Sequence, residues 1–112
     1  LATEKTTVKR LLARLEKRFG EHHYKRLDTN FPLKKRAALM KFCAEQPPAK
    51  LAGSPLAEVK TFDGVKYIAD NGAWLMLRGS GTEPILRIYA EANSVTKARQ
   101  LIQLGVRLTH KV

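Results

Sequence analysis

The residue types that bind anions are concentrated in one short segment, Arg78-Gly79-Ser80-Gly81-Thr82-Glu83-Pro84. Its arginine carries a planar guanidinium that fits a phosphate group bidentately. Ser80 and Thr82 add hydroxyl donors. Gly79 and Gly81 allow positive φ and let backbone amides approach a ligand closely. These donors exceed what a plain turn requires, so their spacing predicts a phosphate-binding loop.

A second arginine follows the loop. The even-numbered residues of 86–92 are apolar and should face a core, so Arg87 should face the opposite side of its strand. The same alternation in the preceding strand places Arg78 on that non-core side. Two guanidinium groups beside the loop would form an anion clamp. The alternative is a surface hairpin whose arginines pair with Glu83 and Glu91.

Two helices are expected before the strands that carry this loop. Apolar residues recur at helical spacing over residues 4–19 and again over residues 32–45, where Pro47 and Pro48 stop the pattern. Residues 21–32 are expected to be irregular, and residues 46–55 to be a linker. The basic residues of the second helix are expected to face solvent: Lys34, Lys35, Arg36 and Lys41.

An alternating pattern after residue 55 predicts a sheet. The turn signals Asp63-Gly64 and Asp70-Asn71-Gly72 separate its first three strands, and Ser94 is placed to cap a last helix. Short turns between neighbouring strands predict an α+β domain with a four-stranded, mostly antiparallel sheet and helices packed on one face. The expected strands are residues 56–62, 65–69, 73–78 and 84–92.

Composition limits the class of protein. The chain has 112 residues, the size of one domain, and no apolar run approaches the roughly 20 residues of a membrane span. Its 21 basic residues against 10 acidic ones give a net charge of +11, which suits an anionic partner, a solubilising surface or a patch that faces another domain. Cys43 is the only cysteine, so no intrachain disulfide is expected. The composition therefore predicts a cytoplasmic domain. Leu1 in place of Met favours a fragment or a processed chain.

The loop and the strand after it, residues 78–92, closely resemble the phosphate-binding loop of the α-D-phosphohexomutases. This superfamily includes phosphoglucomutase, phosphomannomutase and phosphoglucosamine mutase. The resemblance implies their fourth, C-terminal domain, with a fold like that of the TATA-box-binding protein, over residues 21–112. Residues 1–20 would be a linker helix or the start of the domain. Gly79 departs from the pattern, because many members have proline there, and this loosens the loop entrance.

The resemblance also implies a function for the loop. In the parent enzyme a phosphoserine exchanges a phosphoryl group with a hexose phosphate, with magnesium and a hexose bisphosphate activator. The C-terminal domain closes over the site and holds the phosphate that is not reacting. The implied partners are thus a hexose phosphate and the other domains of the enzyme. The residues implied in that contact are Arg78, Gly79, Ser80, Gly81 and Thr82, with Arg87 assisting.

The catalytic parts of the family pattern do not occur in this sequence. The phosphoserine loop (Thr-Ala-Ser-His-Asn-Pro), the metal loop (Asp-Gly-Asp-Xaa-Asp-Arg) and the sugar-selecting loop (Gly-Glu-Xaa-Ser-Gly) are all missing. The chain alone is therefore expected to contain no catalytic residue and no metal site, and not to transfer phosphoryl groups, a reaction that depends on metal and positioning. The resemblance specifies a phosphate contact and no particular sugar.

A basic nucleic-acid-binding module is the alternative function. An antiparallel sheet that exposes Trp74 and Tyr89, together with the charge of +11, would suit a single strand. The basic residues, however, cluster in helical segments away from these aromatics. Packing of Trp74, Met76 and Tyr89 against another domain is the preferred interpretation, and the phosphate loop is preferred to nucleic acid. No membrane partner is expected.

Overall fold

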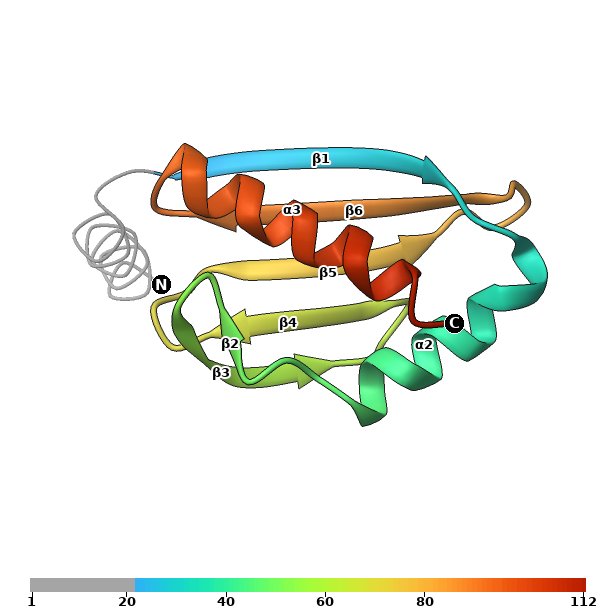
Figure 1. The fold of residues 1–112 in the computed structure, drawn as a ribbon, viewed down its shortest axis with the longest axis horizontal. Coiled ribbons are helices and arrows are strands. Elements are labelled where there is room, and N and C mark those ends of the chain that lie inside the picture. The colour runs from blue at the N-terminus through green and yellow to red at the C-terminus, as the bar shows by residue number, and fades with distance from the viewer. Residues whose placement is uncertain (1–21) are drawn as a thin grey trace, which may run out of the picture.

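The computed structural model describes residues 22–112, which fold into a six-stranded antiparallel sheet with two helices (Figure 1). The expected α+β class is confirmed, whereas the expected number of four strands is wrong. Strands follow the spatial order β1-β6-β5-β4-β3-β2. The elements are β1 (His23–Asn30), a short 3-10 helix η1 (Leu33–Lys35), α2 (Arg36–Glu45), β2 (Lys50–Leu51), β3 (Ser54–Lys60), β4 (Val65–Ala69), β5 (Trp74–Gly79), β6 (Ile85–Ala92) and α3 (Val95–Thr109).

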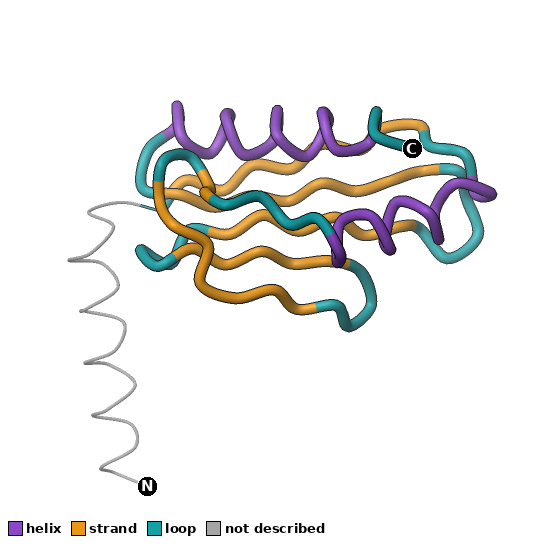
Figure 2. Tube along the Cα trace, turned by 60° about the horizontal axis from the view of Figure 1, so that its bottom comes forward, coloured by secondary structure: helices purple, strands orange, loops and turns teal. Residues whose placement is uncertain are grey.

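The two helices cover the same face of the sheet. Residues of both helices are buried in the same core, Leu39 and Cys43 from α2 and Leu101 from α3, as the sequence predicts, and Figure 2 shows α3 running along the strands with α2 near one end of them. The core lies between the layers, because strands β4, β5 and β6 bury every second residue against the helices. The other face carries no helix among the described residues, and we call it the open face. Neither α2 nor α3 is long and apolar enough to cross a membrane.

Helix α3 packs along the sheet through small and apolar residues at helical spacing. Its buried residues are Ala98, Leu101, Gly105 and Leu108. The expected cap is confirmed, because Ser94 Oγ accepts a hydrogen bond of 3.1 Å from the amide of Lys97.

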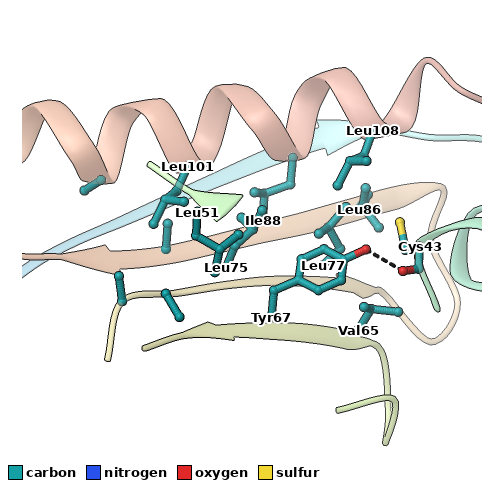
Figure 3. Close-up of a cluster of buried hydrophobic side chains, with 14 of the residues drawn as sticks. Cys43, Leu51, Val65, Tyr67, Leu75, Leu77, Leu86, Ile88, Leu101 and Leu108 are labelled. Carbon is teal, nitrogen blue, oxygen red and sulfur yellow. Dashed lines mark hydrogen bonds between the residues drawn. The ribbon is translucent and has the colours of Figure 1, made fainter. Parts of the chain in front are cut away.

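Helix α2 is joined to the sheet by a buried hydrogen bond. The hydroxyl of Tyr67 on β4 donates to the carbonyl oxygen of Cys43 over 2.6 Å, and both side chains are fully buried (Figure 3). Burial raises the pKa of the Tyr67 hydroxyl and of the Cys43 thiol, because each charged form would lose its hydration.

The expectation of an irregular segment at residues 21–32 is wrong. Residues 23–30 form edge strand β1, which pairs antiparallel with β6 along its whole length. This strand is mostly exposed and polar, so it has no clear hydrophobic alternation. Its structure comes from pairing with a strand about 60 residues later in the chain, which local patterns do not show.

The expectation of a linker at residues 46–55 is also wrong in part. Lys50 and Leu51 form β2, which pairs with the start of β3 around a two-residue turn. Ala52 and Gly53 in that turn take positive φ values of 49° and 88°. Leu51 is fully buried. One buried apolar side chain within a proline-rich stretch anchors the segment to the core.

The remaining boundaries differ by small shifts. The helix expected over residues 32–45 begins as the 3-10 turn η1 and becomes α-helical at Arg36. The first expected strand starts and ends two residues earlier, at Ser54 and Lys60. The helix expected over residues 4–19 lies outside the described residues.

Candidate functional site

The loop between β5 and β6 is held in shape by its own hydrogen bonds. The amide of Ser80 donates to Ile85 O over 3.0 Å, and the amide of Ile85 donates to Glu83 O over 2.7 Å. The amide of Glu83 donates to Ser80 Oγ over 3.4 Å. Part of the donor set that the sequence suggested for a ligand is therefore used to fold the loop.

The tip of the loop keeps donors for a ligand. Gly81 and Thr82 are exposed, and their amides have no hydrogen-bond partner within residues 22–112. The hydroxyl of Thr82 is exposed as well, and the hydroxyl hydrogen of Ser80 stays available because Ser80 Oγ acts as an acceptor inside the loop. Two amides and two hydroxyls thus lie within three consecutive residues.

The two loop glycines, Gly79 and Gly81, do not take the positive φ that the sequence suggested. A Cβ on Gly81 would meet nothing within 4 Å, whereas a Cβ on Gly79 would lie 2.2 Å from Nε of Arg36. A side chain at position 79 would therefore displace the end of the Arg36 side chain, whereas the backbone conformation there does not call for glycine.

Arg36 is a loop contact that the sequence analysis missed, since it was expected to face solvent. Its Nη2 atom donates to the carbonyl oxygen of Glu83 over 3.0 Å. The amide of Phe31 anchors the same loop by donating to Pro84 O over 2.9 Å. In Figure 1 the β5–β6 loop lies beside the turn that leads into α2. A basic residue at the first position of a helix was the only sequence signal, and it does not specify a distant loop.

A cavity of about 230 Å³ lies where the loop, the β3–β4 turn and the start of α2 meet. Three of the expected site residues line it together, and Arg78, Thr82 and Arg87 do not. Its lining residues are Arg36, Met40, Asp63, Gly64, Gly79, Ser80 and Gly81.

The two predicted arginines lie where alternation placed them. Arg78 on β5 and Arg87 on β6 are direct register partners on the open face. Like charges in directly opposed positions repel each other, so a negative charge beside this pair is stabilising. The Nε atom of Arg87 is buried and has no hydrogen-bond partner. Asp28 is the register partner of Arg87 on β1.

The alternative of arginines paired with Glu83 and Glu91 does not describe the structure. Arg78 Nη2 instead lies 3.1 Å from Asp63 Oδ2, in the β3–β4 turn. Glu91 lies 3.4 Å from Nδ1 of His22. The turn that supplies Asp63 is the expected one, and Asp63 and Gly64 both take positive φ there.

The open face also carries an aromatic group beside the arginines. The ring of Tyr24 lies 6.2 Å from that of Trp74 and 6.4 Å from that of Tyr89. Lys66 Nζ lies 4.6 Å from the centre of the Trp74 ring, and Arg26 lies 5.8 Å from that of Tyr89. The expectation that basic residues lie away from these aromatics is therefore wrong for Arg26 and Lys66, while residues 4–19 lie outside the described residues.

Arg26 and Asp28, two residues apart on β1, form an ion pair at the β1 edge of this face. Their side chains form hydrogen bonds of 3.0 and 2.8 Å. The bond from Arg26 lowers the pKa of the Asp28 carboxyl, which stays ionised beside Arg87.

The described residues, 22–112, do not fit a magnesium site. Within residues 22–112, no three side chains of His, Cys, Asp or Glu come together as metal ligands. The two aspartates at the turns, Asp63 and Asp70, lie at opposite ends of β4. No step of the function below passes through a metal held by these residues.

Comparison with known proteins connects this geometry to a family. A family model described as phosphoglucomutase/phosphomannomutase, C-terminal domain, matches residues 3–104. A phosphoglucomutase/phosphomannomutase of Thermococcus kodakarensis is 48% identical over 60 residues, which are 54% of this chain and 13% of that protein. A phosphopentomutase of the same organism is 28% identical over 101 residues, 90% of this chain and 22% of that protein. A phosphoglucosamine mutase of Methanococcus aeolicus is 42% identical over 52 residues, 46% of this chain and 11% of that protein. The matched parts thus span less than a quarter of each of these relatives.

Proposed function

The chain belongs to the family of phosphoglucomutase/phosphomannomutase C-terminal domains, and from this premise we propose that its β5–β6 loop binds the non-reacting phosphate of a hexose phosphate. The observation that carries the proposal is the register pair Arg78 and Arg87 beside the unpartnered amides of Gly81 and Thr82. Guanidinium forks, amides and hydroxyls together satisfy the several acceptor oxygens of a phosphate.

The loop supplies two kinds of contact. The amides of Gly81 and Thr82, with the hydroxyls of Ser80 and Thr82, hold a phosphate through short, directional bonds at the loop tip. Arg78 contributes charge and a bidentate fork from the adjacent strand end, and Arg87 adds charge from β6. Gly79 contributes space, because it admits the side chain of Arg36 that supports the loop.

Holding a remote phosphate serves the chemistry at the other end of the sugar. Binding energy from a non-reacting group positions the reacting group and offsets the entropy lost in doing so. In the whole protein, which we place in the cytoplasm, this domain would close the active-site cleft over the substrate. The groups that transfer the phosphoryl group would belong to the other domains. The substrate would be a sugar phosphate, as in the names of the relatives, and we propose a hexose phosphate.

A titration of the chain with phosphate and with glucose 1-phosphate tests the proposal. Amide shifts at fixed ionic strength should centre on residues 79–83. Arg78→Lys keeps the charge and loses the fork, so it should weaken binding by about tenfold or more, as expected for the loss of a charge-assisted hydrogen bond. Arg99→Lys, on the exposed side of α3, is the matched control.

Two results would contradict the proposal. Equal affinities for wild type and Arg78→Lys would indicate a diffuse positive surface, which responds mainly to salt. Salt-sensitive binding of a single-stranded oligonucleotide, with shifts centred on Trp74 and Tyr89, would favour the nucleic-acid alternative.

A further inference from the structure

The side chain of Arg36 packs directly against Gly79, in the space that a side chain at position 79 would fill. A Cβ on Gly79 would lie 2.2 Å from Nε of Arg36 and 2.6 Å from its Cδ and Cζ atoms. No other atoms are as close to that position, so the space beside Gly79 is filled by this one side chain. Any residue larger than glycine at position 79 must displace the guanidinium.

Arg36 also holds the far side of the loop. Its Nη2 atom donates a hydrogen bond to Glu83 O. The same carbonyl oxygen accepts a hydrogen bond from the amide of Ile85. The amide of Glu83 in turn donates to Ser80 Oγ. By holding the carbonyl of Glu83, Arg36 restrains the residue whose amide contacts the hydroxyl of Ser80, one of the proposed phosphate donors.

The placement of Arg36 is specific to that residue. The side chain is half-buried, whereas the adjacent basic residues Lys34 and Lys35 are exposed. Arg36 is the first residue of α2, and that helix is anchored to the core through Leu39 and Cys43. A helix anchored in the core thus holds the guanidinium against an exposed loop.

We propose that Arg36 is a positioning residue of the phosphate loop, acting through the space left open by Gly79. The proposal rests on the phosphate-binding function above for its effect on affinity, but not for the packing itself. Pre-ordering the loop lowers the entropy lost when the ligand binds, so loss of Arg36 should weaken phosphate binding through the order of the loop. The same guanidinium lines the cavity beside Ser80 and Gly81 and adds positive charge there.

A double-mutant cycle of Arg36→Ala and Gly79→Ala tests this coupling. Either single change should remove Arg36 from the loop. Each should therefore speed hydrogen exchange at the amides of Ser80 and Ile85 by about three- to tenfold and weaken phosphate binding by a similar factor. The double variant should be no worse than either single variant, because the second change removes nothing further.

Two matched controls separate this effect from general ones. Gly81→Ala adds the same methyl group to the same loop where no atom lies within 4 Å, so it should leave the exchange of both amides unchanged. Lys34→Ala removes one basic charge from the preceding turn and should leave the exchange unchanged too. Arg36→Lys keeps the charge and a long donor arm, and should recover part of the phosphate affinity lost in Arg36→Ala.

The readouts distinguish this inference from the proposed function. Exchange is measured without phosphate, at a temperature where every variant is folded by circular dichroism. Additive effects in the cycle, or unchanged exchange in Arg36→Ala, would overturn the positioning role even if wild type binds phosphate. Coupling in exchange with no phosphate binding by any variant would overturn the proposed function and leave the packing relationship standing.

Discussion

The carboxylate of Asp63 forms an ion pair with the guanidinium of Arg78, with 3.1 Å between Oδ2 and Nη2. Both side chains are about half exposed, so the pair is weak and open to exchange with solvent. Arg78 is the residue for which we propose the main phosphate contact. A bound phosphate must therefore compete with Asp63, which makes the β3–β4 turn part of the site's affinity.

Asp63→Asn should raise phosphate affinity by removing this competitor. An exposed ion pair of this kind corresponds to about a 1.5- to 5-fold change in binding. Asparagine tolerates the positive φ of 57° at this position, so the turn should persist. The measurement is a phosphate titration of both proteins at equal ionic strength.

Asp70→Asn is the control for that experiment, because it removes the same charge at the opposite end of β4. It should leave the affinity nearly unchanged. If both variants gain affinity equally, overall charge is responsible and the pair between Asp63 and Arg78 has no special role.

Tyr67→Phe should destabilise the domain by about 1–3 kcal/mol, because the carbonyl of Cys43 would keep its burial and lose its donor. Urea unfolding followed by the fluorescence of Trp74 measures the free energy of unfolding. Tyr24→Phe, at a residue that is 53% exposed, should change the free energy of unfolding by less than about 0.5 kcal/mol. Equal stability of wild type and Tyr67→Phe would show that the hydrogen bond contributes nothing net.

Stability should fall at alkaline pH because burial raises the pKa of both Tyr67 and Cys43. The unfolded chain releases these protons near the ordinary values of 10.0 and 9.0, while the folded domain still holds them. Their contribution is thus complete below about pH 9 and is lost as the pH rises above that value. The free energy of unfolding should decrease from pH 8 to pH 10.5, and less steeply in Tyr67→Phe. Parallel pH profiles for the two proteins would contradict this origin.

The parts of the fold that the sequence predicted are those with local signals. Strict alternation in residues 85–92 placed Arg87 and Arg78 on one face, and the structure makes them register partners. The Asp63-Gly64 turn and the Ser94 cap depend on residues close in sequence, and both are present. The loop residues were predicted from their types and spacing, and their contact with phosphate stays a prediction.

The parts that the sequence missed depend on distant partners. Strand β1 is polar and exposed, and pairs with β6 far along the chain. Leu51 is a single buried residue in a proline-rich stretch. Arg36 was assigned to solvent because helical periodicity gives a direction for a side chain and no partner. Its role became visible only through the space that Gly79 leaves.

Gly105→Ala should destabilise the domain although alanine favours a helix by about 1 kcal/mol. Gly105 lies in the buried stripe of α3, and a Cβ there would be 2.7 Å from Cγ2 of Ile88 and 3.4 Å from Cδ1 of Leu75. Both neighbours are fully buried on the central strands, so neither can yield without moving the helix away from the sheet. Overpacking of this kind costs about 1–3 kcal/mol, which exceeds the gain in helix propensity. Thermal unfolding measures the balance, with Gln103→Ala on the exposed side of the same helix as the control for propensity alone. A rise in melting temperature for Gly105→Ala would show that α3 repacks on the sheet at little cost, and would contradict the close contact between Gly105 and Ile88.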